Sequence, residues 1–304
     1  MNSIVEITGE GYGLSVNKGF LLVSHDGDED KIPLSEIEAV VISSHGAWIT
    51  NHALSRLAEE NIPVVHCNRN AMPCALTLPY AANVYRKQRI QTQIDASQPL
   101  RKNLWQQVVR AKISNQAAVL DLFSLLSNDL KQLASHVLSG DKGNAEAIAA
   151  RFYWERLFGP GFKRDPDLPG INSFLNYGYA ILRASMCRVI VAAGLIPELG
   201  IHHHNQMNPF CLADDLMEPY RPFIDLLVKT LNVQSDEGLT PMRKKQLVSI
   251  LDLGLDHLGE ATHLRYCPQR TVGQFVRSLE TKKPDLSYPV IDVGIHKRLQ
   301  ARLL

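Results

Sequence analysis

The hydrophobic pattern of this 304-residue chain changes near Pro79, and that change constrains the fold more than any other feature. Before Pro79, short runs rich in β-branched residues alternate with Gly, Asn and Asp, which is typical of strands and turns. Beyond Pro99, apolar residues recur every three or four positions, as in amphipathic helices. We therefore expect an α+β protein, with a small N-terminal β-rich, sandwich-like domain followed by a larger all-α C-terminal domain. The corresponding ranges are 1–82 for the β-rich domain, 83–99 for a linker and 100–304 for the helical domain.

The β-rich part contains clear turn and cap signals. A hairpin is expected to turn at Asp26–Gly27, because this pair favours the backbone of a tight two-residue turn. Asn51 is expected to cap a short helix. Nothing here has the spacing of a catalytic or metal site, so an interaction module without chemistry is the favoured interpretation. The expected strands are Ser3–Thr8, Gly13–Val16, Phe20–Ser24, Lys31–Pro33, Ala39–Ile42 and Ile62–His66.

The helical part is expected to hold several long helices. Three of them cover residues 100–137, 144–158 and 172–193, and each is followed by a glycine that can end a helix. Asn144 is a suitable N-cap for the second. The most apolar segment, Tyr179–Leu195, contains two arginines, so we interpret it as a buried helix and not as a membrane span. Further helices are expected to about residue 257.

Charge is distributed unevenly along the chain although its net value is only +1. Residues 1–82 carry four Lys/Arg and ten Asp/Glu, whereas residues 83–304 carry twenty-eight and twenty-one. A basic helical part favours a polyanionic partner, although such an excess is common in a domain of this size. The five cysteines form no CxxC pair, which argues against a zinc ribbon or a disulfide framework and favours a reducing compartment. No signal-peptide pattern is visible, so a cytoplasmic protein without a membrane association is expected.

The richest chemistry lies in residues 200–221, GIHHHNQMNPFCLADDLMEPYR. Three adjacent histidines cannot all point the same way on a regular element, so at least one of them is structural or faces solvent. Asp215 and Glu218 stand three apart and share one face of a helix. Histidine nitrogen together with carboxylate oxygen suits Mn²⁺ or, with more oxygen and water, Mg²⁺. The competing interpretation is that the acids only stabilise the start of a helix through its dipole.

Glu146 is a third acidic candidate, in the first turn of the helix expected at 144–158. Small residues beside it leave room for a bulky group, but a carboxylate there could simply stabilise the helix dipole by about 0.3–1 kcal/mol. Taken together, these residues suggest a mixed His/carboxylate site with open positions, unlike a closed structural zinc site. Such a site can polarise a phosphodiester. A helical domain with incidental acids, a small-phosphoester hydrolase and a redox metalloprotein remain the alternatives.

Three strings of the chain resemble one known family. They are NAEAIAARFYWERLFG at 144–159, INSFLNYGYAILRA at 171–184 and GLIPELGIHHHNQMNPFCLADDLMEPYRP at 194–222. In this order they are similar to the universal CRISPR adaptation integrase, the larger of the two CRISPR-associated proteins that insert new spacers. The compact length and the DLMEP ending are most similar to the form found in type II systems. The β-rich start and the helical remainder also match, so the resemblance covers nearly the whole chain.

The resemblance implies a metal site made by Glu146, His203 and Glu218, with Asp215 as a further acidic position close to the metal. A shift of one residue in the alignment would put His202 or His204 in the place of His203. The implied cofactor is Mg²⁺ or Mn²⁺. These three ligands are also the implied catalytic residues.

The resemblance further implies a DNA integrase and metal-dependent endonuclease that serves antiviral defence. A prespacer 3′-hydroxyl would attack a phosphodiester of the CRISPR repeat, and water in its place would cut DNA. The implied partners are duplex DNA, a second copy joined through the N-terminal domains, and the small CRISPR-associated partner, in a heterohexamer. A catalytically inactive DNA-binding scaffold of the same complex is the alternative. Candidate phosphate contacts are Arg151, Arg183, Arg188, Arg221, Lys244 and Lys245.

Overall fold

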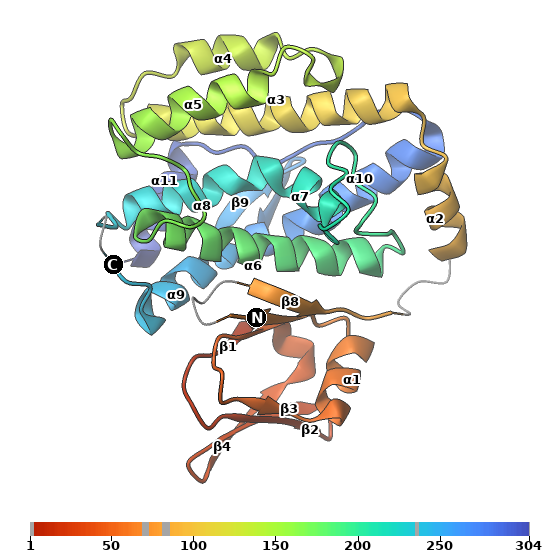
Figure 1. Ribbon diagram of the computed structural model, residues 1–304, viewed down its shortest axis with the longest axis vertical. Helices are drawn as coiled ribbons and strands as arrows, with labels where there is room; N and C mark the ends of the chain where they lie inside the picture. Colours follow the sequence, from red (N-terminus) through yellow and green to blue (C-terminus); the bar gives the residue numbers. More distant parts are fainter. Residues whose placement is uncertain (1–2, 69–72, 81–85, 235–236, 304) are drawn as a thin grey trace.

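A computed structural model describes residues 3–68, 73–80, 86–234 and 237–303 of the chain. A strand-rich N-terminal part lies against one side of a larger helical part (Figure 1). This arrangement confirms the expected α+β class, with a β-rich start and a mainly helical remainder. Residues 83–85 of the expected linker lie outside the described residues.

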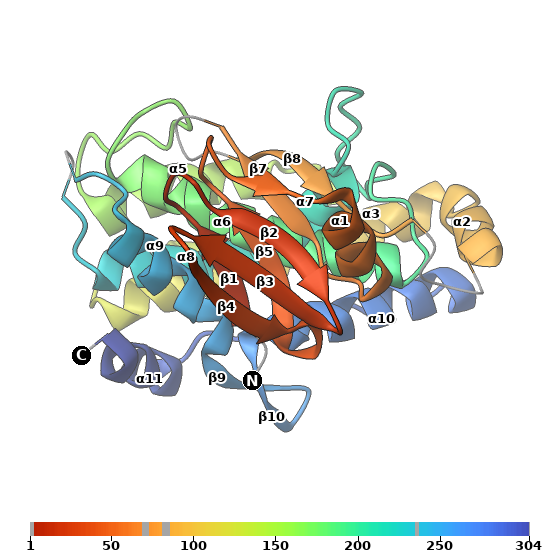
Figure 2. The same ribbon diagram turned by 90° about the horizontal axis from the view of Figure 1, so that it is seen from below.

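One sheet of the N-terminal part is a meander with a short extra strand. The chain turns between β3 and β4 at Asp26 and Gly27, whose φ angles of 50° and 93° are both in the left-handed region. This is the backbone that a two-residue hairpin turn requires, so the expected turn is confirmed. The strands β4, β3 and β2 are seen face-on in Figure 2. The order across the sheet is β4 (Asp28–Pro33), β3 (Phe20–His25), β2 (Gly13–Asn17) and β6 (Trp48–Ile49), with β6 parallel to β2.

The second sheet packs against the first around a shared apolar core. Apolar residues of both sheets and of α1 (Asn51–Glu59) form this core, which accounts for the sandwich-like character. The N-cap of α1 is Thr50 and not Asn51, because Thr50 Oγ1 accepts the N–H of Ala53 at 3.1 Å. The edge strand β8 was not expected from the sequence, since proline at its first position disguises it. The order is β1 (Ser3–Ile7), β5 (Ile37–Ile42), β7 (Val64–Cys67) and β8 (Pro73–Thr77), with only β8 antiparallel to its neighbour.

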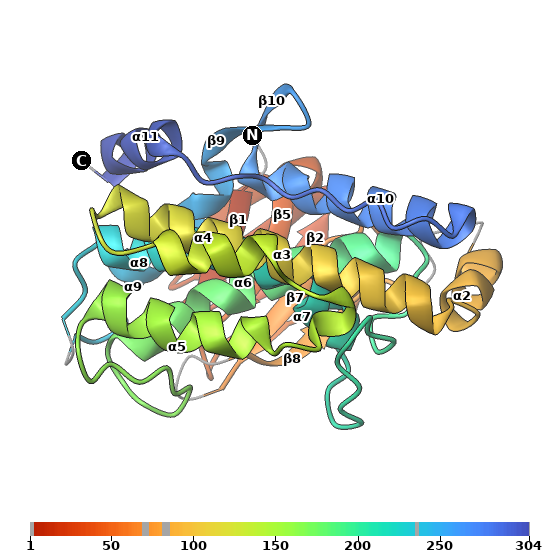
Figure 3. The ribbon, with the colours of Figure 1, turned by 90° about the horizontal axis from the view of Figure 1, so that it is seen from above.

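The helical part is built around two long helices, α3 and α6. Figure 3 shows α3, α4 and α5 side by side on the side away from the sheets, where α3 contacts both others. One continuous hydrophobic cluster joins α3, α5, α6, α8 and α10. The helices are α2 (Arg86–Ile94), α3 (Gln98–Leu122), α4 (Asn128–Ser135), α5 (Ala145–Phe158), α6 (Ile171–Ala192), α7 (Cys211–Met217), α8 (Arg221–Thr230), α9 (Pro241–Val248), α10 (Cys267–Thr281) and α11 (Val293–Leu303).

Three expectations for the helical part are corrected by the structure. The helix expected at 100–137 is broken after Leu122, where Ser124 takes a left-handed φ of 55°. Asn144 makes no capping bond, and Asp141 accepts the N–H groups that begin α5 instead. The helices expected to continue to residue 257 give way to an antiparallel hairpin, β9 (Gly254–His257) with β10 (Glu260–His263), so this part is not purely α.

Helix α6 connects the two parts of the molecule. On one side, Ala184 packs against Val41 and Val65 of the second sheet. On the other, Gly178 lets α8 approach closely, because a Cβ at this position would overlap Ile224. The segment expected to be a buried helix is therefore confirmed as one. Within the described ranges, no helix combines the length and the apolar character that a membrane crossing requires.

A buried polar joint adds to the contact between the two parts. The Tyr177 hydroxyl of α6 donates to the Glu6 carboxylate of β1. Lys244 Nζ of α9 lies 4.0 Å from the same carboxylate. Burial raises the pKa of Glu6, while Tyr177 and Lys244 act in the opposite direction. Because Lys244 is buried in this joint, it is not exposed as a phosphate contact.

Candidate metal centre

Glu146 and Glu218 meet at a single lysine. Lys112 Nζ of α3 lies 2.6 Å from Glu146 Oε1 and 2.6 Å from Glu218 Oε2. Glu146 stands in the first turn of α5, whose start is held by Asp141. Glu218 begins a 3₁₀ turn that follows α7 directly. Two carboxylates that are 72 positions apart in the chain therefore share one cation.

The charge of Glu218 is maintained although its side chain is only 5% exposed. Burial acts to raise the pKa of Glu218, but Arg221 and Lys112 outweigh it and hold this pKa below its usual range. Arg221 Nη2 lies 3.0 Å from Glu218 Oε1. Burial likewise acts to lower the pKa of Lys112, and Glu218 and Glu146 reverse that effect. The site is therefore a buried set of charges that depend on one another.

Asp215 positions the loop that carries the histidines, residues 194–210, which we call the histidine loop. Asp215 is fully buried, and its Oδ2 accepts the backbone N–H of Ile201 at 2.6 Å and of His202 at 2.8 Å. Gly200 permits this close approach, because a Cβ there would lie 2.8 Å from Asp215 Oδ2. The backbone N–H groups of the loop need the Asp215 carboxylate as acceptor, and that carboxylate needs a residue without a Cβ at position 200. These two needs explain the aspartate after the histidines and the glycine before them.

His203 is oriented by the same carboxylate. Its Nδ1–H donates to Asp215 Oδ1, and this bond raises the pKa of His203 against the opposing effect of burial. With Nδ1 donating, the neutral ring presents the lone pair of Nε2 outward. Its side chain is 45% exposed, so Nε2 can reach a ligand. A carboxylate that accepts the second ring N–H is one of the usual ways in which a metal-binding histidine is oriented.

The other two histidines have different surroundings. His202 stacks flat on Trp105 of α3, with ring centroids 4.4 Å apart and an interplanar angle of 2°. Trp105 also meets His203 edge-on at 5.6 Å. His204 is exposed. Among the three histidines, the described contacts give a carboxylate partner to His203, and the ligand role of His203 stays a prediction.

The residues present fit a divalent metal in the chemistry of their donor atoms. In the described ranges no three His, Cys, Asp or Glu side chains are close enough to enclose an ion, since the Lys112 ammonium lies between the two glutamates. That ammonium marks a place where the protein concentrates negative charge. Glu218 Oε2 is buried, and Lys112 Nζ is its cationic neighbour at 2.6 Å. Oxygen and imidazole donors of this kind suit Mg²⁺ or Mn²⁺.

Lys112 and Trp105 were not identified from the sequence. Both stand on the buried face of α3, seven positions apart, and so belong to the same stripe of the helix. Lys112 interrupts an apolar stripe that includes Val108 and Val109. A lysine at that position was the available signal, because a buried ammonium needs carboxylates around it.

Side chains of α2 form hydrogen bonds to the backbone at the start of the histidine loop. Gln93 Nε2 donates to the carbonyl oxygens of Ile196 at 2.9 Å and Leu199 at 3.0 Å, and Gln93 Oε1 accepts the N–H of Ile196. Arg89 Nη1 donates to the carbonyl oxygen of Ala193 at 2.7 Å. The segment just before the histidines is therefore fixed by four hydrogen bonds from one helix.

Four of the six candidate phosphate contacts fall into two groups. Arg183 donates from Nε and Nη2 to both oxygens of Asp214, at 2.7 and 2.9 Å, and Arg221 is engaged with Glu218. Arg151 and Lys245 are exposed. Two of the six candidates therefore lie beside the site, and others lie on the open surface of the helical part.

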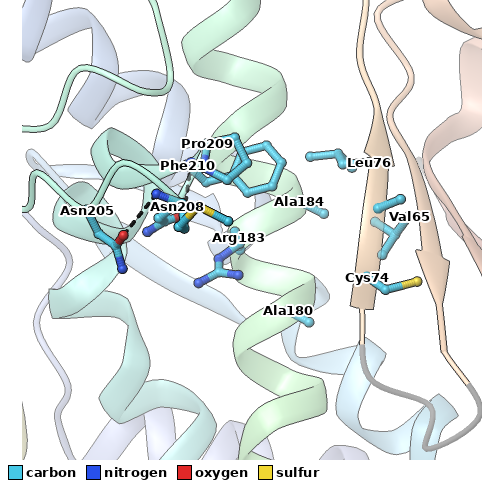
Figure 4. Close-up of a pocket in the computed structure, with 12 residues that line it drawn as sticks. Val65, Cys74, Leu76, Ala180, Arg183, Ala184, Asn205, Asn208, Pro209 and Phe210 are labelled. Atoms are coloured by element: carbon cyan, nitrogen blue, oxygen red, sulfur yellow. Dashed lines mark hydrogen bonds between the residues drawn. The ribbon is translucent and has the colours of Figure 1, made fainter.

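A cavity of about 420 Å³ lies between the two parts of the molecule. Figure 4 shows residues that line it. Arg183 and Ala180 of α6 line one wall, and Leu76 of β8 lines another. Asn208 and Phe210 come from the histidine loop. The strand-rich part thus contributes directly to the surface beside the site.

Comparison with known proteins identifies close relatives of the chain. Residues 5–236 match the family model described as CRISPR associated protein Cas1. A protein of Neisseria meningitidis serogroup C, named CRISPR-associated endonuclease Cas1, is 41% identical over 242 residues, which is 78% of this chain and 79% of that protein.

Two solved structures share the fold. A casposase bound to integration product superposes with a TM-score of 0.76 at 21% identity, over 99% of this chain and all of that one. A Cas6-RT-Cas1–Cas2 complex superposes with a TM-score of 0.73 at 20% identity, over 93% of this chain and 35% of the matched chain. At such identities these likenesses establish the architecture of the chain.

Proposed function

The chain belongs to the CRISPR-associated Cas1 family, and on that premise we propose that it is a metal-dependent DNA integrase and endonuclease of CRISPR adaptation. One observation carries the proposal. The two glutamates share the Lys112 ammonium, and His203 stands beside them with Nδ1 held by Asp215. This is a prepared cation site on the basic half of the chain, where a phosphodiester can be bound.

Glu146, Glu218 and His203 Nε2 would hold the ion. When bound, Mg²⁺ or Mn²⁺ would polarise a phosphodiester and stabilise the charge on its oxygens. Asp215 keeps His203 in the required tautomer, and Arg221 supports the charge of Glu218. Lys112 would leave the space between the carboxylates, and its ammonium would then be available to the anionic substrate.

The nucleophile in this proposal is the DNA itself. The 3′-hydroxyl oxygen of a prespacer strand attacks a phosphorus atom of the repeat, and the existing bond from phosphorus to a 3′ oxygen breaks. The hydroxyl proton passes to the departing oxygen through solvent, so the number of phosphodiesters is unchanged. With water as the nucleophile the same exchange cuts the strand. No serine or cysteine nucleophile is required.

We further propose the assembly that the family resemblance implies. The β-rich part would join two copies, and two such dimers would bind a dimer of the small adaptation partner. Support comes from a solved structure of the same fold whose name includes Cas1 and Cas2 together. The casposase structure bound to integration product supports DNA as the substrate.

The decisive experiment is integration of a labelled prespacer into a supercoiled plasmid that carries the repeat. We expect product with the small partner and Mg²⁺ or Mn²⁺, and none with EDTA. Glu146→Ala and His203→Ala should each lower the rate on the order of 100-fold or more, as for other losses of transition-state stabilisation. Glu155→Ala, an exposed glutamate on the same helix, is the matched control and should react normally.

Two outcomes would contradict this assignment. Integration by Glu146→Ala or His203→Ala at the rate of the Glu155→Ala control would remove these residues from the chemistry. A wild-type chain that binds the duplex and the partner but forms no product with either ion would be an inactive DNA-binding scaffold.

A further inference from the structure

A smaller cavity lies beside the candidate metal centre, and no role has been assigned to it. Its volume is about 220 Å³, which is room for several waters at about 30 Å³ each. Three guanidinium groups line it, from Arg164, Arg183 and Arg221. Tyr179 and Asn176 complete its polar lining, and none of the described residues that line it is acidic.

Arg164 is held in this cavity by neutral groups. Its Nη1 donates to Asn172 Oδ1 at 3.1 Å and its Nη2 to Asn176 Oδ1 at 2.6 Å. Its guanidinium also lies 5.4 Å from the ring centroid of Tyr179. These partners orient the side chain without neutralising it, because amide oxygens and an aromatic ring carry no net charge.

The same two asparagines also fasten the loop from which Arg164 projects. Asn172 Nδ2 donates to the carbonyl oxygen of Lys163 at 3.0 Å, and Asn176 Nδ2 to that of Pro166 at 2.8 Å. Two asparagines one helical turn apart on α6 therefore hold both the backbone and the side chain. Arg164 is prepared for a ligand before the ligand arrives.

Arg183 and Arg221 bring two further positive charges, and the acids that pair with them lie outside the lining of the cavity. Asp214 pairs with Arg183 and Glu218 pairs with Arg221, and neither acid lines the cavity. Three cations face two carboxylates, so the cavity keeps an excess of positive charge. Arg221 Nε is buried and has no hydrogen-bond partner among the described residues, which adds an unused donor.

A third acid, Asp225, lies nearby and interacts electrostatically with Arg164. It accepts hydrogen bonds from the hydroxyls of Tyr153 and Tyr179, and burial raises the pKa of Asp225 to about 7. At neutral pH it therefore offsets only part of the charge of Arg164. The balance still favours an anion.

We propose that this cavity is a phosphate subsite, which binds a backbone phosphate of the DNA strand next to the phosphate that reacts. The proposal rests on the function proposed above, and it adds side chains that bind the DNA substrate. Arg221 contacts Glu218 on one side and lines the cavity on the other, so the two phosphates would be separated by one guanidinium. Guanidinium groups are the side chains best suited to phosphate oxygens, because their paired donors match them.

The first test compares two neighbouring cations of one loop. Arg164→Gln and Lys163→Gln each remove one positive charge, but the Lys163 side chain is 77% exposed and only near Asp165 at 3.5 Å. Binding of a short duplex with 3′ overhangs is measured at several KCl concentrations in EDTA. The logarithm of the binding constant falls as the logarithm of the salt concentration rises. Losing one phosphate contact should make this negative slope shallower by roughly 0.7–0.9. We expect this change, with about tenfold weaker binding, for Arg164→Gln only.

The second test leaves the contacts of Arg164 untouched. Ala180 of α6 also lines the cavity, so Ala180→Glu adds a negative charge there, and Ala180→Gln adds a side chain of the same size without charge. Ala180→Glu should bind the duplex about tenfold more weakly than Ala180→Gln at low salt. This pair separates loss of a phosphate site from damage to the loop, since both variants disturb packing equally.

The outcomes separate the subsite from the proposed function. If wild type binds the duplex while Arg164→Gln matches Lys163→Gln in slope and Ala180→Glu matches Ala180→Gln in affinity, the subsite is wrong and the integrase proposal stands. If wild type with its partner does not bind the duplex, both proposals are wrong. Addition of inorganic phosphate at constant ionic strength identifies the ligand source. Stabilisation of wild type but not of Arg164→Gln, without any difference in DNA slope, would assign the cavity to free phosphate and overturn the DNA subsite.

Discussion

Glu218 and Asp225 are two buried carboxylates seven positions apart, and they have opposite surroundings. Glu218 lies between the cations Lys112 and Arg221, which hold its pKa below the usual range against the effect of burial. Asp225 accepts from the hydroxyls of Tyr153 and Tyr179, and burial raises its pKa to about 7. Both side chains are almost inaccessible to solvent.

The difference shows that burial alone does not decide what a carboxylate can do. A carboxylate between two cations keeps its charge and can exchange one cation for another. A carboxylate between two hydroxyls is satisfied by hydrogen bonds and offers no place for an ion. The contrast can be tested at the cation, at the carboxylates and by pH.

Removal of the shared cation should have the largest effect. Lys112→Met removes the cation that Glu146 and Glu218 share and leaves Glu218 with Arg221 alone, so stability in metal-free buffer should fall by about 3–5 kcal/mol. Mn²⁺ should then raise the melting temperature of the variant more than that of wild type, because the ion no longer competes with the ammonium. Thermal unfolding with and without Mn²⁺ measures both effects.

Lys131→Met is the matched control for that experiment. Lys131 Nζ pairs with Asp121 at 2.7 Å on the surface, where such a pair contributes about 0–1 kcal/mol. The control should lose little stability and respond to Mn²⁺ as wild type does. Equal Mn²⁺ responses of Lys112→Met and the control would show that Lys112 does not occupy an ion site.

Neutralising Glu218 and Asp225 in separate variants should reduce strand-transfer activity to different extents. Glu218→Gln should slow strand transfer on the order of 100-fold or more, since a donor oxygen for the ion is lost. Asp225→Asn keeps an acceptor for a tyrosine hydroxyl and should slow it less than tenfold. The prespacer integration assay measures both, and comparable losses in the two variants would erase the functional distinction between these acids.

The last expected effect, which is the smallest per pH unit, is a pH dependence that belongs to Asp225. Its folded-state pKa of about 7 is above the ordinary value of 3.8, so the folded state holds the extra proton between these values. The stability from this group is therefore fully present below about pH 4 and is lost as pH rises through 7. Across that window the loss approaches roughly 1.4 kcal/mol per pH unit.

Urea unfolding at pH 5 and pH 7.5 tests this dependence. The stability of wild type relative to Asp225→Asn should fall between the two pH values, because the amide does not titrate. Glu6→Gln is the comparison variant for Asp225→Asn, because burial also raises the pKa of Glu6. A difference between wild type and Asp225→Asn that does not change with pH would mean that Asp225 is charged throughout.

Local pattern predicted much of the fold. The period change near Pro79 predicted the order of the two parts, and the glycine after α6 predicted its end. The hairpin at 254–263 was missed, because its turn uses Leu258 and Gly259, with φ of 61° and 77°, in place of a familiar Asn-Gly pair. Asp256 Oδ1 stabilises that turn by accepting the N–H of Gly259.

The candidate site was only partly accessible from the sequence. The family resemblance implied Glu146, His203 and Glu218 as the ligands, and these assignments stay predictions until they are tested. The distinction between His203 and His202 could not come from spacing, because it depends on Asp215 and on the ring of Trp105, which is about a hundred positions away. Contacts between distant segments become visible only in the folded chain.

Because Glu6, Tyr177 and Lys244 form a joint between the two parts of the chain, the strand-rich part is not readily replaced by that of a relative. Its three members come from β1, α6 and α9, so a chimera that imported residues 3–80 alone could leave Lys244 and the Tyr177 hydroxyl without their acceptor. A transplanted strand-rich part would therefore have to carry an acid at position 6. One hydrogen-bonded contact thus limits which strand-rich parts this helical part can accept.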